Sequence, residues 1–382
     1  MRGLSERTAA ILDWVWGGRR TLLAVFLLLL VLRLSLQVFE RLPIEGTGLA
    51  LDWRSIWGGV RGGQPSYETG LRIPPWGAIL LIPFGLLSLR SSWALITLAT
   101  ISGLVACVPR EWGRWQRLIA TILLTTSYSA LRLFADGNIE VLIIVGILLM
   151  IRSLPRRNNW ALAGAVLLIT LKIQETWLLL IILASHVTRQ WPRKLWLGAA
   201  GIVAAVCVPS LLWLGPAWWG AFAGIQQRGS IMDASILAGL ARLGLPGWMA
   251  GVVWLVLLGA IILLARKAPS LVGREWAGLL VSASLVLAPY AAGNSLVTVL
   301  AIGVTPMLAA WPIVGAVVFL LDDLKYALSG DFMFQWGALY ATAQFLLIGA
   351  ILYVRRWRAS SEDSGRGTRR ISGDPAIDQH AV

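Results

Sequence analysis

Apolar runs long enough to cross a lipid bilayer recur along almost the whole chain, and they restrict what it can fold into. A hydrocarbon core about 30 Å thick is crossed by a helix of about 20 apolar residues. Of the 382 residues, 57% are hydrophobic and 14% are charged, whereas about a quarter of a soluble domain is charged. The sequence therefore predicts an all-α fold, a polytopic transmembrane helix bundle.

The number of apolar runs predicts roughly 12 transmembrane helices, with the runs around Pro306 and Pro312 taken as one broken element. The runs lie at residues 21–36, 75–89, 93–108, 118–134, 139–151, 160–171, 176–187, 195–214, 249–265, 276–292, 295–309, 312–321 and 337–354. We divide the chain into a basic cytoplasmic N-terminal segment at 1–20, a transmembrane domain at 21–355 and a disordered cytoplasmic tail at 356–382.

The formal net charge of +14 follows the topology of the chain and does not indicate nucleic-acid binding. Arginine clusters lie in short gaps between apolar spans, which is typical of cytoplasmic loops and of attraction to anionic membrane lipids. The clusters assigned to the cytoplasmic face lie at 152–157, 189–194, 266–274 and 355–358. The segments at 37–74, 135–138, 172–175, 215–247, 292–295 and 322–335 then face the other side of a cell membrane.

One stretch of the chain conflicts with this orientation. Arg110, Arg114 and Arg117 form a basic cluster that belongs on the cytoplasmic face. Two full crossings between residues 75 and 108 would place it outside. Either one of the two segments fails to cross, or the charge rule is violated here.

Polar and charged side chains gather in the segments assigned to the non-cytoplasmic face. They are Asp52, Arg54, Arg61, Glu68 and Arg72 in a long first loop, Arg132, Asp136, Asn138 and Glu140 at a second turn, Lys172, Gln174 and Glu175 at a third, and Asn294 at a fourth. Charged groups at span ends also snorkel toward water, which is the alternative for Arg72, Arg132 and Glu140. Convergence of four turns on one face favours an extracytoplasmic site.

Lys172 interrupts a continuous apolar run where no cytoplasmic charge cluster accounts for it. A lone ammonium at a helix turn suits a phosphate oxygen. The alternative is an ion pair with Glu175, three residues further along the same helix surface.

Asp52 stands without a second carboxylate of matching position, whereas hydrolysis of glycosides calls for two. A single placed carboxylate fits a general base that deprotonates an acceptor hydroxyl. Phosphate-binding glycine loops and the common protease and hydrolase motifs are missing from the sequence. Only two histidines occur, so we expect no histidine-based metal site and no cofactor.

Short motifs after the first span resemble those of a known enzyme group. They are Asp52, Gly62-Gly63-Gln64-Pro65-Ser66-Tyr67, Ile73-Pro74-Pro75-Trp76 leading to Pro83-Phe84-Gly85-Leu86-Leu87, Asp136-Gly137-Asn138, and Lys172-Ile173-Gln174. The arrangement resembles the GT-C superfamily of membrane glycosyltransferases, and within it the bacterial alpha-mannosyltransferases that use polyprenyl-phosphate-mannose. The resemblance covers about residues 20–355 and is strongest at 50–180.

The chain departs from the pattern of that group at several motif positions. Ile73 replaces a tyrosine, Asn138 a glutamine and Ile173 a proline. The late polar turn, Ala288-Pro289-Tyr290 followed by Gly293-Asn294-Ser295, lacks the histidine that relatives often carry. This last departure bears on the identity of the sugar.

The resemblance implies transfer of a hexose, mannose in this branch, from a polyprenyl phosphate to a hydroxyl of a lipid- or polymer-bound acceptor. Asp52 is implied as the general base, Lys172 with Arg132 or Arg72 as the donor phosphate site, and Arg54, Asn138, Gln174, Glu175 and Asn294 as substrate-binding residues. We expect Asp52 and Lys172 to face one cavity. The polyprenyl-phosphate sugar and the glycan or glycolipid acceptor are the implied partners, and no metal is required.

Two other classes of membrane protein remain open from the sequence. A secondary transporter or lipid flippase would favour pseudo-symmetric halves and charges near the membrane midplane, and neither is evident. A non-catalytic scaffold has no need of the polar first loop. Transfer of labelled sugar from polyprenyl phosphate separates the enzyme from both.

Overall fold

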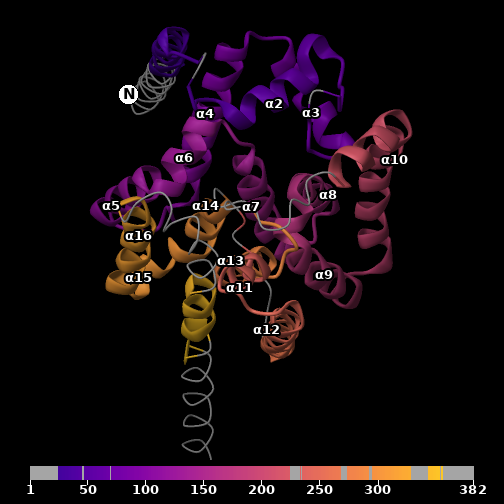
Figure 1. The fold of residues 1–382 in the computed structure, drawn as a ribbon, viewed down its shortest axis with the longest axis vertical. Coiled ribbons are helices and arrows are strands. Elements are labelled where there is room, and N and C mark those ends of the chain that lie inside the picture. Colours follow the sequence, from indigo (N-terminus) through magenta and orange to yellow (C-terminus); the bar gives the residue numbers. More distant parts are fainter. Residues whose placement is uncertain are drawn as a thin grey trace, which may run out of the picture. The chain divides into compact units, whose positions relative to one another are not determined.

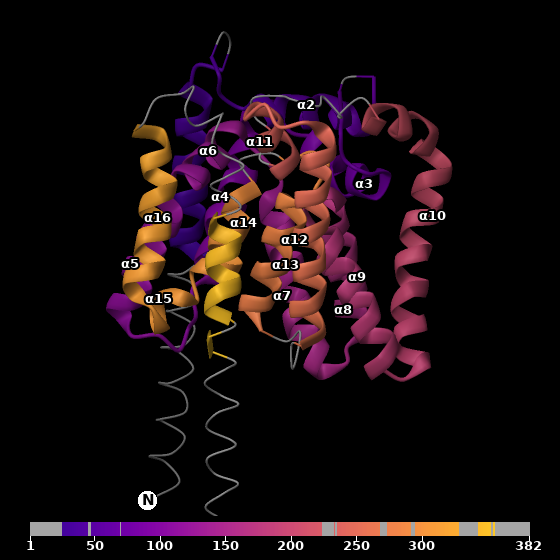
Figure 2. The same cartoon turned by 60° about the horizontal axis from the view of Figure 1, so that its bottom comes forward.

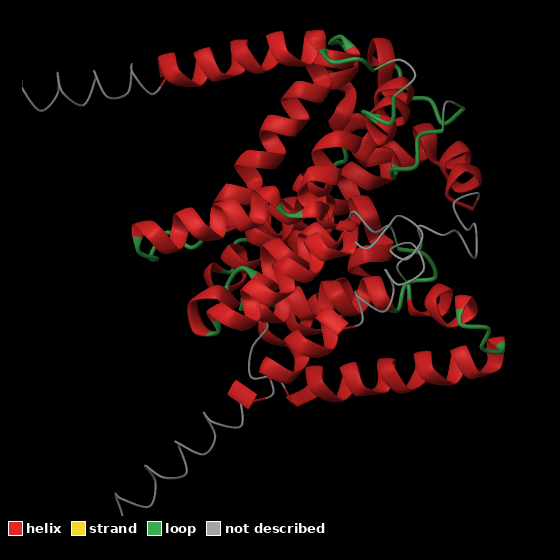
Figure 3. Ribbon diagram, turned by 60° about the vertical axis from the view of Figure 1, so that its left-hand side comes forward, coloured by secondary structure: helices red, strands yellow, loops and turns green. Residues whose placement is uncertain are grey.

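The computed structural model describes residues 25–44, 47–68, 70–223, 233, 235–267, 273–291, 295–327, 343–352 and 354–355. Every regular element within these ranges is a helix (Figure 1), and Figure 3 shows them joined by short loops. The prediction of an all-α fold is therefore confirmed for this part of the chain. The predicted segments at 1–20 and 356–382 lie outside it.

Contacts between backbone segments divide the chain into two compact units, and each is treated by itself. The first holds residues 1–103, 132–139 and 207–223, and the second holds 104–131, 140–206 and 224–382. Three helices, α4 (Leu89–Cys107), α6 (Tyr128–Asp136) and α10 (Arg193–Ala223), continue from one unit into the other.

The helices of the first unit, besides parts of those three, are a helix at residues 25–41, α2 (Leu51–Val60), η1 (Arg61–Gly63) and α3 (Pro75–Gly85). The second unit adds α5 (Arg114–Thr126), α7 (Glu140–Arg156), α8 (Asn159–Ile169), η2 (Thr170–Lys172), α9 (Ile173–Gln190), α11 (Ile236–Arg242), α12 (Gly247–Lys267), α13 (Arg274–Val286), α14 (Leu296–Val299), η4 (Leu300–Val304), α15 (Met307–Ala310), α16 (Pro312–Ala327) and a helix at 343–352.

Helices able to cross a membrane are fewer than the sequence predicted. Among the described residues, four are long and apolar enough: Leu89–Cys107, Asn159–Gln190, Arg193–Ala221 and Gly247–Leu264. The pair α5 and α6, bent by 54°, makes a fifth if it is one span. The expected 12 crossings are therefore wrong by this measure of length and composition.

Apolar runs exceed candidate spans in number for two reasons, because some form helices too short to cross and others join into one helical stretch. The run at 75–89 forms only α3, whose 11 residues reach about 16 Å, about half the thickness of the hydrocarbon core. The runs at 160–171 and 176–187 belong to one stretch of 32 residues, Asn159–Gln190. A hydropathy profile does not show that a helix ends before its apolar run does. It also does not show that two apolar runs belong to one helical stretch.

The short α3 bears on the conflict over Arg110, Arg114 and Arg117. Between residues 75 and 108, α4 is the helix long and apolar enough to cross a membrane, and α3 is shorter than such a span. This favours the alternative in which one of the two segments fails to cross.

Several long helices expose most of their apolar surface. In the most apolar stretches of α10 and α12, only 11% of residues are buried. Helix α10 has 31 residues, and Figure 2 shows it as a long helix. Apolar surface of this extent is stable against lipid and not against water. The chain is therefore described as a membrane protein.

Packing in the first unit fixes the start of α2 against the end of α6. The Trp53 indole is fully buried and donates to Ser92 Oγ at 2.9 Å, and Trp93 Nε1 donates to Phe134 O at 3.0 Å. The Ala50 amide donates to Ala135 O at 2.6 Å. These bonds hold the residues that follow Ala50 next to those that follow Ala135.

Gly137 is required at this junction for two reasons. Its φ of +68° lies in the left-handed region, which side chains other than glycine rarely adopt. A Cβ added there would lie 2.6 Å from Trp53 Cβ and 2.8 Å from Trp93 Cδ1. Only a residue without a side chain fits.

The core of the second unit forms around α13, of which ten consecutive residues from Ala277 to Val286 are buried. A Cβ on Gly278 would lie 2.3 Å from Gly303 Cα, so α13 and η4 cross in backbone contact. Ser284 ties α13 to α9, because its hydroxyl accepts from Leu178 N at 3.1 Å and its carbonyl from Trp177 Nε1 at 3.2 Å. This core carries the polar residues of α7, α9 and α14.

We predict that Gly137→Ala lowers the free energy of unfolding by about 2 to 5 kcal/mol, since it adds left-handed strain to a steric clash. Gly201→Ala is the matched control, because nothing lies within 4 Å of a Cβ at Gly201 in α10. Thermal unfolding of the purified protein in detergent measures both. Equal melting temperatures for the two variants would contradict the packing described here.

Candidate functional site

Asp52 lies in the first turn of α2, where a carboxylate interacts favourably with the helix N-terminus. The side-chain amide of Asn138 donates from Nδ2 to Asp52 Oδ2 at 2.6 Å. Asn138 follows Gly137 directly, so the left-handed turn that ends α6 aims this amide at the carboxylate. The structure therefore brings together two residues that the sequence assigned to a site.

Polar atoms of Asn138, and of residues two positions from it or from Asp52 in the sequence, are buried without hydrogen-bond partners. They are Asn138 Oδ1, Asp136 Oδ1, and Nε and Nη2 of Arg54. Asp136 and Asn138 are only 5% and 7% exposed, so water does not freely solvate them. Buried polar atoms are nearly always paired, and each exception calls for an explanation. The open oxygens of Asp136 and Asn138 can accept hydrogen bonds from hydroxyl groups of a ligand, and the open nitrogens of Arg54 can donate to hydroxyl oxygens.

Arg132 is bound within the first unit. Its Nε lies 2.9 Å from Asp136 Oδ2, one helical turn along α6. This bond uses Oδ2 of the Asp136 carboxylate, and Oδ1 has no hydrogen-bond partner. The predicted role of Arg132 in phosphate binding would have to use its two Nη groups.

Arg72 lies in the segment between η1 and α3, where it is exposed and makes no hydrogen bond or ion pair with a described residue. Tyr67 anchors this segment by donating its hydroxyl to Ile73 O at 2.9 Å. Burial raises the pKa of the Tyr67 phenol, so it remains a donor at neutral pH. Arg72 is the cation of this segment open to an anion.

A second polar cluster lies in the second unit around Lys172. The Lys172 ammonium forms an ion pair with Glu140 Oε1 and lies 3.3 Å from Glu175 Oε1. Ser295 Oγ lies 2.9 Å from Glu140 Oε1 and also contacts Glu175 Oε1, and Thr298 Oγ1 donates to Glu140 Oε2 at 2.8 Å. Both glutamates are fully buried.

Lys172 therefore has Glu175 as a carboxylate partner, as the sequence allowed, and Glu140 as a second one. Its side chain is only 12% exposed, and two carboxylates face one ammonium. A phosphate oxygen at Lys172 would have to displace one of them. The Glu175 pairing is observed, whereas phosphate binding stays a prediction.

Sequence reasoning missed Glu140, Ser295 and Thr298 as members of this cluster. The alternative prediction that Glu140 snorkels toward water is wrong, because its side chain is fully buried. The sequence signal that could have indicated Glu140 as a site residue is its position two residues after Asn138. No local pattern connects it to Ser295, which is 155 residues away.

The remaining predicted residues are placed as follows. Gln174 is half-buried at the start of α9 and makes no hydrogen bond with a described residue. Asn294 lies outside the described residues. Within the part of the chain that the structure describes, no three His, Cys, Asp or Glu side chains gather as a metal site.

Lys172→Ala leaves two buried carboxylates without a cation. We predict a loss of about 3 to 5 kcal/mol in the free energy of unfolding, as for other broken buried ion pairs. Lys194→Ala, at an exposed position of α10, serves as the control and should unfold close to wild type. Chemical denaturation in detergent compares the two, and equal stabilities would refute the structural role of Lys172.

Comparison with known proteins identifies the family. The model of glycosyltransferase family 87 matches residues 74–289, more than half of the chain. The match contains Asn138, Glu140 and Lys172 and begins after Asp52. No curated protein and no solved structure matches. The chain belongs to glycosyltransferase family 87 and is a membrane glycosyltransferase.

Proposed function

We propose that the enzyme transfers mannose from a polyprenyl-phosphate donor to a hydroxyl of a lipid- or polymer-bound acceptor. The family supplies the reaction class. The exposed apolar faces of α10 and α12 support a donor that reaches the protein through lipid. A sugar carried on a polyprenyl chain is such a donor.

The observation that carries the proposal is the Asp52 carboxylate held by Asn138 beside buried atoms without partners. A general base must be fixed within hydrogen-bond reach of the proton it removes. The Asn138 amide fixes one carboxylate oxygen of Asp52. The open atoms of Arg54, Asp136 and Asn138 supply donors and acceptors for the hydroxyls of an acceptor sugar.

The proposed step balances in the following way. The acceptor hydroxyl gives its proton to the Asp52 carboxylate, and the acceptor oxygen forms a bond to the anomeric carbon. The bond from that carbon to the phosphate oxygen breaks, and the electron pair leaves with polyprenyl phosphate. Cations that meet the leaving phosphate stabilise its charge as it develops.

We assign the donor phosphate to Lys172 together with Arg132 or Arg72. Lys172 then exchanges Glu140 or Glu175 for a phosphate oxygen during the cycle. Arg72 is exposed without a partner among the described residues, and it needs no such exchange. Gln174, Glu175 and Asn294 are assigned to the sugar hydroxyls of the donor.

Charge distribution supports an extracytoplasmic site. If the chain starts inside, the first span carries it out, α3 stays on that side and α4 returns it. Arg110, Arg114 and Arg117 then lie in the cytoplasm, as basic clusters do. On this topology α2, which carries Asp52, lies on the extracytoplasmic side.

Asp52→Asn removes the proposed base and preserves side-chain size. We expect it to reduce transfer of radiolabelled mannose from polyprenyl phosphate by about 100- to 10,000-fold, which is the range of general base catalysis. Glu68→Gln, an exposed carboxylate of the same loop region, should keep normal transfer. Near-normal activity of Asp52→Asn at equal protein abundance would rule out the assignment.

The donor is tested by competition between two forms of the same sugar. Purified enzyme with acceptor extract should transfer label from polyprenyl-phosphate-mannose and none from a mannose nucleotide. The sequence contains no glycine-rich phosphate-binding loop for a nucleotide. Transfer from the nucleotide alone would overturn the donor class but leave the family intact.

A further inference from the structure

The helix at residues 25–41 presents a largely apolar, exposed surface. Phe26, Leu28 and Leu34 are 61%, 67% and 51% exposed. Near its end the helix is attached to α4 within the first unit, where the rings of Phe39 and Trp93 meet edge to face at 4.6 Å. An apolar helix held at one end and otherwise exposed lies against lipid in a membrane enzyme.

Three polar side chains interrupt this surface at a regular spacing. Arg33, Gln37 and Arg41 follow one another at every fourth residue, so they share one face of the helix. All three are exposed, and none forms a hydrogen bond or ion pair with a described residue. A guanidinium beside hydrocarbon is costly without an anion.

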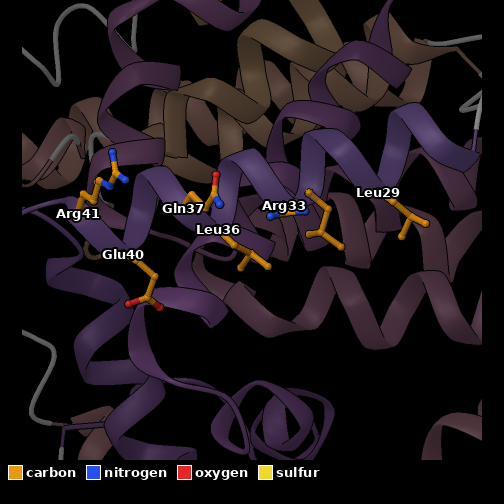
Figure 4. Close-up of a pocket in the computed structure, with 7 residues that line it drawn as sticks. Leu29, Arg33, Leu36, Gln37, Glu40 and Arg41 are labelled. Carbon is orange, nitrogen blue, oxygen red and sulfur yellow. The ribbon is translucent and has the colours of Figure 1, made fainter.

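The same face lines an open groove of about 390 Å³. Figure 4 shows Arg33, Gln37 and Arg41 along it, together with Leu29, Leu36 and the Glu40 carboxylate. Leu29 and Leu32 lie toward the start of the helix, and the stretch from Arg33 to Arg41 that follows carries the cations, with Leu36 within it. The groove thus has an apolar part and a cationic part in the order in which a lipid carries its chains and its phosphate.

Charge favours an anion in this groove in spite of Glu40. The Glu40 carboxylate lies 4.0 Å from Arg90 Nη1 of α4, so a cation of the neighbouring helix offsets its charge. A cation near a helix C-terminus is favourable in itself, which accounts for Arg41. It does not account for Arg33, two turns earlier.

We propose that this face binds an anionic phospholipid, with its phosphate between Arg33 and Arg41, beside Gln37, and its acyl chains along Leu29 and Leu32. Guanidinium groups bind phosphate oxygens through paired hydrogen bonds, and the Gln37 amide supplies a further donor. The bound lipid holds the first helix beside α4. The site is independent of the sugar donor and of Asp52.

Native mass spectrometry of the full-length protein tests the proposal with phosphatidylglycerol and phosphatidylcholine of identical chains. Phosphatidylglycerol should bind more tightly. Arg33→Gln combined with Arg41→Gln should weaken it about tenfold, the effect of losing one or two charge-assisted hydrogen bonds. The control variant combines Arg110→Gln with Arg114→Gln, at two exposed arginines of the second unit. It removes the same charge and should leave the binding of phosphatidylglycerol unchanged.

A photoactivatable phosphatidylglycerol on the wild-type protein gives a second measurement that needs no variant. Its crosslinks should map to the peptide that contains residues 29–41. Crosslinks elsewhere, equal binding of the two phospholipids, or equal weakening by both double variants would overturn the site. Displacement of phosphatidylglycerol by an equimolar amount of polyprenyl phosphate would overturn the choice of lipid.

Discussion

Polar groups inside an apolar bundle must find partners within it, and the rest of this structure depends on that constraint. An unpaired charge in such surroundings costs several kcal/mol, which is comparable to the net free energy of unfolding of a protein. Glu140 meets the constraint through Lys172, Ser295 and Thr298. These contacts join α7, η2 at the start of α9, and α14, so the buried Glu140 carboxylate links three helical segments around the α13 core.

Much of the fold was predictable where an apolar run is also an uninterrupted helix. The runs at 93–108 and 195–214 became α4 and α10, and α10 continues through Pro209. The run at 75–89 was misjudged, because α3 ends at Gly85, where a Cβ would lie 1.8 Å from Val60 O. Hydropathy reports how apolar a segment is, whereas tertiary contacts decide where the helix ends.

The site was predictable where its contacts are local or its residues are unusual for their surroundings. Asp52 and Asn138 stand out as polar residues beside apolar spans, and they meet. Lys172 and Glu175 are three residues apart on one helix, and they also meet. The bond between Lys172 and Glu140 joins residues 32 apart, and only the packing of α7 against its neighbours determines it.

The two polar clusters differ in how completely their buried polar atoms are paired. Around Lys172 each carboxylate has a cation or a hydroxyl. Around Asp52 several buried atoms have no partner. A folded protein keeps such atoms at a cost, and binding sites are where a ligand offsets it. This difference supports the proposal that places the acceptor hydroxyls at Asp52. Lys172 could receive a phosphate only by giving up a contact that stabilises the fold.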